Sequence, residues 1–123
     1  DIEAETGGTF LGDGPIRTML AACEEWPRGD LPAGFHDPVR SDVPVLILSG
    51  ETDPATPARW GEQAAKTLQN ALYLVMPGVS HSPFPDCAIG IMTALVETGT
   101  TDNLDTSCVA EIPVPKFDIP GDD

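Results

Sequence analysis

The apolar stretch at residues 43–50, which reads VPVLILSG, decides the fold. Its apolar side chains stand at consecutive positions and do not alternate with polar ones. A strand of this kind is buried on both faces, which is typical of a parallel sheet that helices cover. A second stretch of the same character, ALYLVM, follows at residues 71–76. The pattern therefore predicts an α/β protein with one parallel, right-handed βαβ unit.

Three helices are expected to flank these strands because apolar residues recur at helical spacing. The first opens at Pro15 and stops at Trp26, the second is capped by Thr56 and begins at Pro57, and the third stops at Gly99. The apolar faces consist of Ile16, Met19, Leu20 and Cys23 in the first helix, Gly61, Ala64, Ala65 and Leu68 in the second, and Ala88, Ile91, Met92 and Leu95 in the third.

Four parts are expected along the chain: a loop or disordered terminus at 1–13, a helix with an irregular connection at 14–42, an α/β core at 43–99 and an extended tail at 100–123. No third stretch has the quality of the two strands. Two parallel strands cannot cover their own edges and faces. We therefore expect an incomplete sheet, whose other strands come from another chain, a symmetry mate or a segment outside this sequence.

The charge balance disfavours several classes of partner. The 123 residues carry a formal net charge of −14, from 20 acidic and 6 basic side chains. Nucleic acid and anionic membrane surfaces would be repelled. No apolar run approaches the ~18–20 residues that span a bilayer, and residues 1–10 lack the pattern of a signal peptide. Two histidines and three cysteines without ligand spacing, and no phosphate-binding glycine pattern, predict neither a metal nor a cofactor.

Candidate catalytic side chains follow both strands. Asp53 lies after the first strand, and His81 follows the second, 28 residues later in the chain. The carboxyl ends of parallel strands meet at one edge of a sheet, so these side chains are expected to lie close together. A carboxylate that accepts one imidazole N–H leaves the other ring nitrogen free as a general base. Glu51 is the competing carboxylate and His36 the competing base, and an Asp before Pro is also a common turn residue.

The nucleophile that would complete a triad is absent from the sequence. No Gly-x-Ser-x-Gly pentapeptide occurs, and the nearest segment is GVSHS at 78–82. Ser80 is adjacent to His81, and neighbouring side chains diverge on an extended loop, so Ser80 is a poor nucleophile for that base. A weak esterase that recruits Ser80 or Ser82 stays open as an alternative.

The three cysteines leave one without a partner. A bridge between Cys87 and Cys108 would close a loop of about 20 residues and stabilise the fold by roughly 3 kcal/mol in the chain-entropy model. Cys23 is then either a buried free thiol or the partner of a cysteine outside this sequence. A disulfide favours an oxidising compartment.

Several of these motifs, taken in order, resemble the C-terminal region of the tripeptidyl-aminopeptidase-like α/β-hydrolases, a family related to the proline iminopeptidases. The resemblance extends over roughly residues 15–120. The matching segments are AACEEWP at 21–27, VPVLILSGETDPATP at 43–57, NAL at 70–72, GVSHS at 78–82 and the cysteines Cys87 and Cys108.

The resemblance implies the C-terminal part of a secreted or extracytoplasmic serine exopeptidase, which releases residues or short peptides from peptide N-termini. It implies Asp53 as the triad acid, His81 as the base, a Cys87–Cys108 disulfide, and the end of a cap region at 14–42. The family's nucleophile, oxyanion hole and most of its sheet precede these motifs. Catalysis on a peptide or ester is therefore expected only together with an N-terminal part of the hydrolase.

A different class of function also stays open, namely an inactive binding or assembly module that works alone or as a strand-exchanged dimer. Four acidic residues could in principle hold a substrate amine, but solvated surface charge is the ordinary role of such side chains, and we assign them none. These residues are Glu3, Glu5, Glu24 and Glu25.

Overall fold

The computed structural model describes residues 1–82 and 84–116. The chain divides into two compact units, Asp1–His36 and Asp37–Asp123, and each is described by itself. The division falls inside the irregular connection that the sequence predicts at 27–42. The second unit contains both predicted strands, so the candidate site belongs to it.

The N-terminal unit contains two helices, α1 (Ile2–Thr6) and α2 (Gly14–Glu25). Residues 1–13 were expected as a loop, and α1 is therefore a correction. The Asp1 carboxylate caps it by accepting the Glu3 amide at 3.1 Å, and acidic side chains in the first turn suit the positive end of the helix dipole. A cap of this kind stabilises a single turn that apolar periodicity does not reveal.

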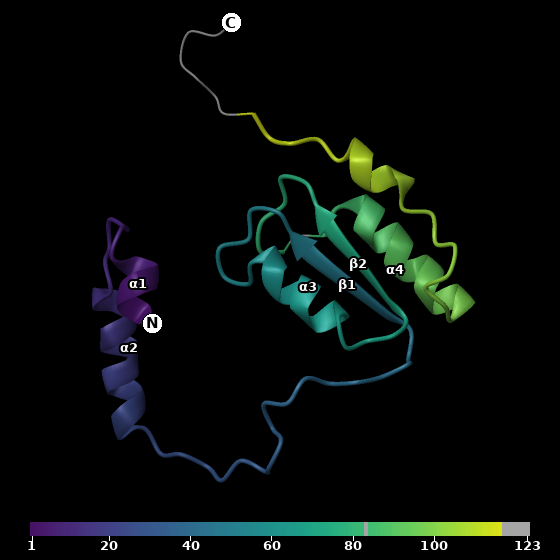
Figure 1. Ribbon diagram of the computed structural model, residues 1–123. Helices are drawn as coiled ribbons and strands as arrows, with labels where there is room; N and C mark the ends of the chain where they lie inside the picture. The colour runs from purple at the N-terminus through teal and green to yellow at the C-terminus, as the bar shows by residue number, and fades with distance from the viewer. Residues whose placement is uncertain (83, 117–123) are drawn as a thin grey trace, which may run out of the picture. The chain divides into compact units, whose positions relative to one another are not determined.

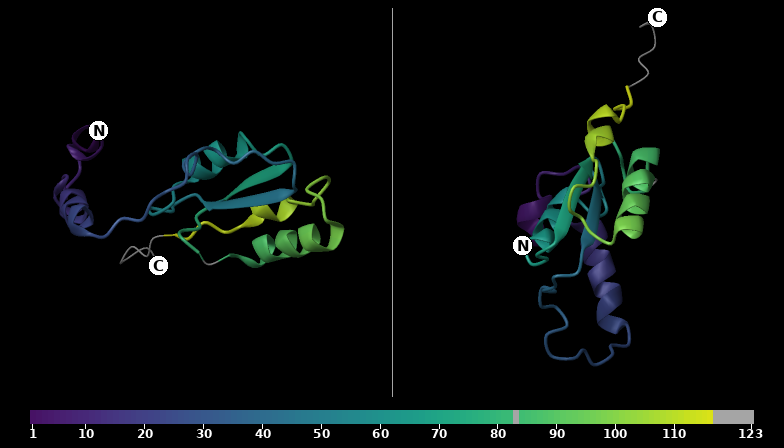
Figure 2. Two further views of the ribbon diagram at one scale, coloured as in Figure 1. Left: turned by 90° about the horizontal axis from the view of Figure 1, so that it is seen from below. Right: turned by 90° about the vertical axis from the view of Figure 1, so that its right-hand side faces the viewer.

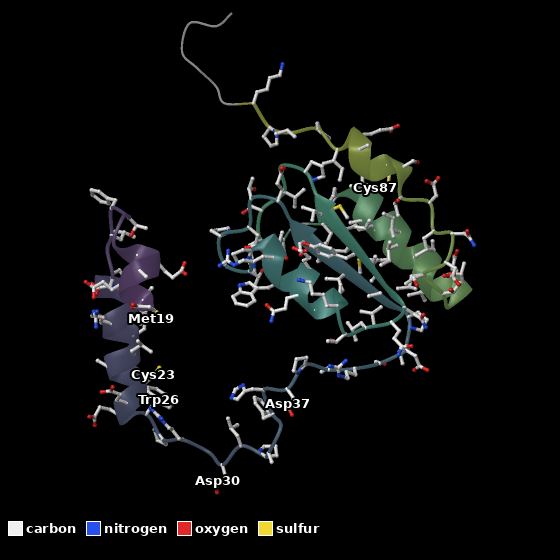
Figure 3. All side chains as sticks on the ribbon, in the orientation of Figure 1. Met19, Cys23, Trp26, Asp30, Asp37 and Cys87 are labelled. Carbon is white, nitrogen blue, oxygen red and sulfur yellow. A yellow bond between two sulfur atoms is a disulfide. The ribbon has the colours of Figure 1, made fainter. Side chains whose placement is uncertain are left out.

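Helix α2 begins and ends where the sequence predicts. It carries proline in its first turn and stops at Trp26, whose backbone is extended. Its apolar face is open to solvent within this unit, and Met19 and Trp26 are 69% and 74% exposed. Figure 3 labels Met19 and Cys23 on α2 and Trp26 directly after it. The Cys23 thiol is exposed and has no disulfide partner among the described residues, so the expectation of a buried thiol is wrong for this unit.

The second unit is built on two parallel strands, β1 (Val45–Gly50) and β2 (Ala71–Met76). They pair in register from Val45 opposite Ala71 to Gly50 opposite Met76. Helix α3 (Ala58–Ala65) connects them and covers one face of the sheet, and α4 (Asp86–Thr98) covers the other (Figures 1 and 2). Within the described ranges the sheet has these two strands. This confirms the predicted βαβ unit and the partial α/β fold.

Helix α3 approaches the sheet closely because Gly61 has no side chain. A Cβ atom there would lie 2.6 Å from Ser49 Oγ and 2.7 Å from Tyr73 Cε2. The Tyr73 hydroxyl donates to the carbonyl of Ala58 at 2.6 Å and fixes the start of the helix. The predicted inner face is wrong at one position, because Ala64 is exposed.

The core of the second unit is small. Met76, Ala88 and Ile91 are its buried apolar side chains among the described residues. Both strands are half-buried along nearly all of their length, although their apolar runs predict burial on both faces. Two strands without further neighbours leave edges and part of each face uncovered, which explains the difference. An apolar groove of about 300 Å³ lies beside α4 and is lined by Leu46, Leu48, Phe84, Met92 and Leu95.

The chain after β2 is fixed at two places. Helix α4 ends at Gly99, whose φ of 68° is the left-handed conformation that glycine adopts readily, and the Gly99 amide donates to Leu95. Part of the expected extended tail is instead a 3-10 helix, η1 (Ser107–Glu111), which starts where the Asp105 carboxylate accepts the Ser107 amide at 2.9 Å.

A disulfide joins η1 to α4. It links Cys87 and Cys108, whose Cα atoms lie 5.7 Å apart, and Cys87 is labelled at the start of α4 in Figure 3. The last part of the expected tail, residues 117–123, lies outside the described residues. In the part of the chain that is described, no helix is long and apolar enough to cross a bilayer.

Candidate active site

The loops that follow β1 and β2 meet at the carboxyl edge of the sheet, and they bring Asp53 and His81 together. The Nδ1 atom of His81 lies 3.0 Å from Asp53 Oδ2 and 3.2 Å from Asp53 Oδ1. The in-register pairing of the strands causes this, because both loops leave the sheet at the same level. The competing residues take no part in the pair: Glu51 accepts the amide of Gly78, and His36 belongs to the N-terminal unit.

Asp53 is held by its own loop. Its Oδ1 accepts the backbone amides of Ala55 and Thr56 at 2.8 and 2.9 Å, and its Oδ2 accepts the Thr56 hydroxyl at 2.6 Å. The side chain is 6% exposed. Hydrogen bonds to the charged form, from Thr56 first and from His81 and Ala55 in addition, hold the pKa of Asp53 well below its usual range. Asp53 is therefore a fixed, ionised acceptor for His81.

His81 faces Asp53 through one nitrogen and solvent through the rest of its ring. The side chain is 57% exposed. When Nδ1 carries the proton and donates it to the carboxylate, Nε2 holds a free lone pair. In residues 1–82 and 84–116 the hydrogen bonds of the ring all involve Nδ1. The arrangement leaves Nε2 available as a general base.

Thr56 is the site residue that sequence reasoning assigned to a different role. It was expected to cap α3, but Pro57 occupies the cap position. The Thr56 hydroxyl instead donates to Asp53 and lies 3.3 Å from His81 Nδ1. Part of the signal was present in the sequence, because the side chain of an Asp in a turn commonly accepts backbone amides of the residues that follow it.

The serines beside His81 do not complete a triad. Neither Ser80 nor Ser82 forms a side-chain hydrogen bond with the ring of His81 in the described portion of the loop. Ser82 has a φ of 46°, a left-handed backbone conformation that is uncommon for a residue with a side chain.

A small pocket of about 100 Å³ opens beside the Asp53–His81 pair. Its lining combines polar residues of the two loops with apolar side chains of the strands and of Phe84. A reacting group bound there would lie beside the imidazole. In the ranges that the structure describes, no group of three His, Cys, Asp or Glu side chains could hold a metal ion.

Comparisons with known proteins identify the family of this chain. The model of the family described as TAP-like protein matches residues 10–108. The protein named Serine protease Hip1 of Mycobacterium bovis is 30% identical over 104 residues, which cover 82% of this chain and 19% of that protein. Proteins of the same name from two strains of Mycobacterium tuberculosis match to the same extent.

The chain spans about a fifth of the length of these curated relatives. No solved structure matches it. The family match covers both strands, both loops and both cysteines of the disulfide. The chain therefore belongs to the family of TAP-like proteins, which are α/β-hydrolases.

Proposed function

We propose that this chain supplies the acid and the base of a Ser-His-Asp triad in a serine peptidase. Asp53 is the acid and His81 is the base. The observation that carries the proposal is the pairing of His81 Nδ1 with an ionised carboxylate, 6% exposed, at the carboxyl edge of a parallel sheet. The relatives named as serine proteases support it, as does the membership of the TAP-like family.

The chemistry follows from the two nitrogens of His81. A serine hydroxyl adds to the scissile carbonyl carbon, and its proton passes to Nε2 while Asp53 stabilises the imidazolium through Nδ1–H. The imidazolium then gives that proton to the leaving amine, and the C–N bond breaks to leave an acyl-enzyme. Water attacks the ester, with His81 again as base, and the acid product and the free serine are regenerated.

The serine comes from residues outside this sequence. The half-buried strands and the apolar groove beside α4 lack the cover that a complete α/β domain provides. An N-terminal hydrolase segment of the same polypeptide would complete the sheet and bring the nucleophile and the oxyanion donors to Nε2. Curated relatives that are more than four times as long as this chain support this arrangement.

The substrate is a peptide with a free N-terminus, from which the enzyme releases residues or short peptides, and the enzyme works outside the cytoplasm. The motifs shared with the tripeptidyl-aminopeptidase-like hydrolases support the first statement. The Cys87–Cys108 disulfide supports the second, because such bonds persist in oxidising compartments. Acetylation of the substrate's N-terminus should abolish hydrolysis, whereas equal rates on free and acetylated peptides would contradict exopeptidase action.

The triad assignment is tested in the longer polypeptide that carries an N-terminal hydrolase segment. Replacement His81→Ala should lower kcat for a peptidyl p-nitroanilide by at least about 10³-fold, and Asp53→Asn should also lower it strongly. Glu62→Gln is the matched control, because Glu62 is exposed on α3 and is not among the hydrogen-bond partners of the pair in the described residues. Hydrolysis that persists in the His81→Ala protein at the parent rate would refute the assignment.

A second candidate, an inactive binding or assembly module, is favoured by the uncovered apolar groove beside α4. A second copy of the chain would then complete the sheet. Sedimentation equilibrium of the 123-residue chain separates the two candidates: a stable dimer, together with no hydrolysis by the longer polypeptide, would favour the module.

A residual esterase that uses Ser80 or Ser82 is tested with p-nitrophenyl acetate. Activity that survives the combined replacement of Ser80, Ser82 and His81 by Ala would exclude such an esterase.

A further inference from the structure

The loop that carries His81 is held by the loop that carries Asp53, and two residues outside the triad make most of this contact. We infer that Glu51 and Thr52 are positioning residues, which fix the His81 loop so that the Nδ1 edge of the imidazole faces Asp53. The inference rests on the proposed function, because both residues act through the proposed base.

Glu51 contacts the second loop through its backbone and its side chain. Its amide donates to the carbonyl of Met76 at 3.0 Å, where β2 ends. Its Oε2 accepts the amide of Gly78 at 2.8 Å. A carboxylate that accepts a backbone amide makes a stronger hydrogen bond than a neutral acceptor. The same residue therefore fixes the end of β2 and the first turn of the His81 loop.

Thr52 holds the next residue of that loop. Its amide and its hydroxyl both donate to the carbonyl of Val79, each at 3.1 Å. We call the hydrogen bonds of Glu51 and Thr52 to Met76, Gly78 and Val79 the loop–loop contact. These bonds fix the backbone directly before the histidine, and His81 stands two residues beyond the last of them.

The two loops are packed so closely that position 50 needs glycine, and the tail packs equally closely against Gly78. A Cβ atom on Gly50 would lie 2.5 Å from the carbonyl oxygens of both Val79 and Ser80. Gly78 has a φ of 63°, and a Cβ atom on it would lie 2.9 Å from Pro115. The backbone at 78–80 is thus confined between the Asp53 loop and the tail, and small shifts of Glu51 are passed on to His81.

The loop–loop contact differs from ordinary core packing because Glu51 and Thr52 are both exposed. Loss of an exposed side chain usually costs less stability than loss of a buried one. Misplacement of a catalytic group by about 1 Å, in contrast, can cost 10²-fold in rate. The loop–loop contact should therefore influence the geometry of His81 more than the stability of the fold.

Nuclear magnetic resonance of the 123-residue chain tests the inference without any measurement of hydrolysis. The variants are Glu51→Ala, which removes the acceptor, and Glu51→Gln, which keeps an acceptor oxygen, with Glu62→Ala as the charge-matched control on the exposed face of α3. The readouts are the hydrogen exchange of the Gly78 amide and the ring ¹⁵N shifts of His81 at alkaline pH, which distinguish the Nδ1–H from the Nε2–H tautomer. Amide shifts of β1 and β2 report whether each variant keeps the fold.

Glu51→Ala should speed exchange of the Gly78 amide roughly tenfold or more and should shift the His81 ring toward the Nε2–H tautomer, while Glu51→Gln and Glu62→Ala stay close to the parent. Unchanged exchange and tautomer in Glu51→Ala would overturn the inference, and so would a Glu51→Gln variant as disturbed as Glu51→Ala. If Glu51→Ala loses the fold, Thr52→Val, which removes the hydroxyl, is compared with Thr52→Ser, which keeps it. Equal exchange and an equal tautomer in these two variants would overturn the inference.

The failure of this inference can be distinguished from failure of the proposed function. A parent chain whose His81 lacks the Nδ1–H tautomer would contradict the Asp53–His81 pair itself, whatever the Gly78 amide does. A parent with that tautomer and a Glu51→Ala variant that retains it would contradict only the positioning role. In the longer polypeptide, Glu51→Ala should lower kcat with little change in KM, and Glu51→Gln should restore it.

Discussion

Asp53 shows how one short turn prepares a residue for its role. Apart from His81, three donors from Ala55 and Thr56 form hydrogen bonds with its two oxygens. The carboxylate is therefore oriented by its own loop. His81 pairs with an acceptor whose position and charge do not depend on the histidine. Pro57 takes the cap position of α3, and the Thr56 hydroxyl donates to Asp53.

The Thr56 hydroxyl should measurably tune the Asp53 carboxylate. Thr56→Val removes the donor that contributes most to the low pKa of Asp53, so this pKa should rise toward the ordinary value of about 3.9. Thr56→Ser keeps the hydroxyl and should leave the pKa low. The carboxyl ¹³C shift of Asp53, followed from pH 6 downward, measures both variants. An identical titration in Thr56→Val and the parent would contradict the role assigned to the hydroxyl.

The low pKa of Asp53 also predicts how stability changes with pH. A carboxyl whose pKa is lower in the folded state contributes stability that is fully present above its unfolded pKa of about 3.9 and is lost as the pH falls toward the folded value. Asp105, whose pKa is lowered by the Ser107 amide, acts in the same direction. Urea unfolding at pH 6 and near pH 3 should therefore show a smaller loss of stability in Asp53→Asn than in the parent. An equal loss in both would show that Asp53 is not the group responsible.

At the scale of elements, the site depends on segments that the loops bring together from far apart in the sequence. β1 and β2 leave the sheet in register, the loop–loop contact joins their loops, and the tail after η1 packs against Gly78. The disulfide fastens η1 to α4 and so keeps the beginning of that tail in place. A short tail thereby supports the loop of the proposed base through Val114 and Pro115.

Substitution of Gly78 tests this packing. Gly78→Ala places a Cβ atom at a φ of 63° and within 2.9 Å of Pro115, so it should destabilise the fold by about 1–3 kcal/mol. Gly90 is the matched control, because it lies inside α4 with no heavy atom within 4 Å of an added Cβ. Gly90→Ala should be neutral or stabilise by up to about 1 kcal/mol. Urea midpoints that fall equally in both variants would contradict the account of the tail.

At the scale of the whole molecule, the pattern of apolar residues predicts the sheet well and the details of the site only in part. Both strands, the crossover helix and the stop of α4 at Gly99 follow from local pattern and from glycine and proline chemistry. The pairing of Asp53 with His81 follows from the topology of parallel strands. Helix α1 and the 3-10 helix were not predicted, because an element of five residues is too short to show a repeating pattern of apolar side chains.

The contacts that orient the site were beyond prediction for a physical reason. The bonds of Glu51 to Gly78 and of Thr52 to Val79 depend on the register of two loops and on the close approach that Gly50 permits. Such contacts leave no spacing pattern in the sequence. The half-burial of both strands likewise depends on what surrounds the sheet, which local sequence does not contain.

The central claim is that this chain provides the base and the acid of a serine hydrolase and that the nucleophile lies elsewhere. Intact-mass analysis after treatment with a fluorophosphonate tests it most directly. The account predicts no adduct on the 123-residue chain, one adduct on the longer polypeptide that carries an N-terminal hydrolase segment, and loss of that adduct in its His81→Ala variant. A covalent adduct on Ser80, Ser82 or any other residue of the 123-residue chain alone would contradict the claim.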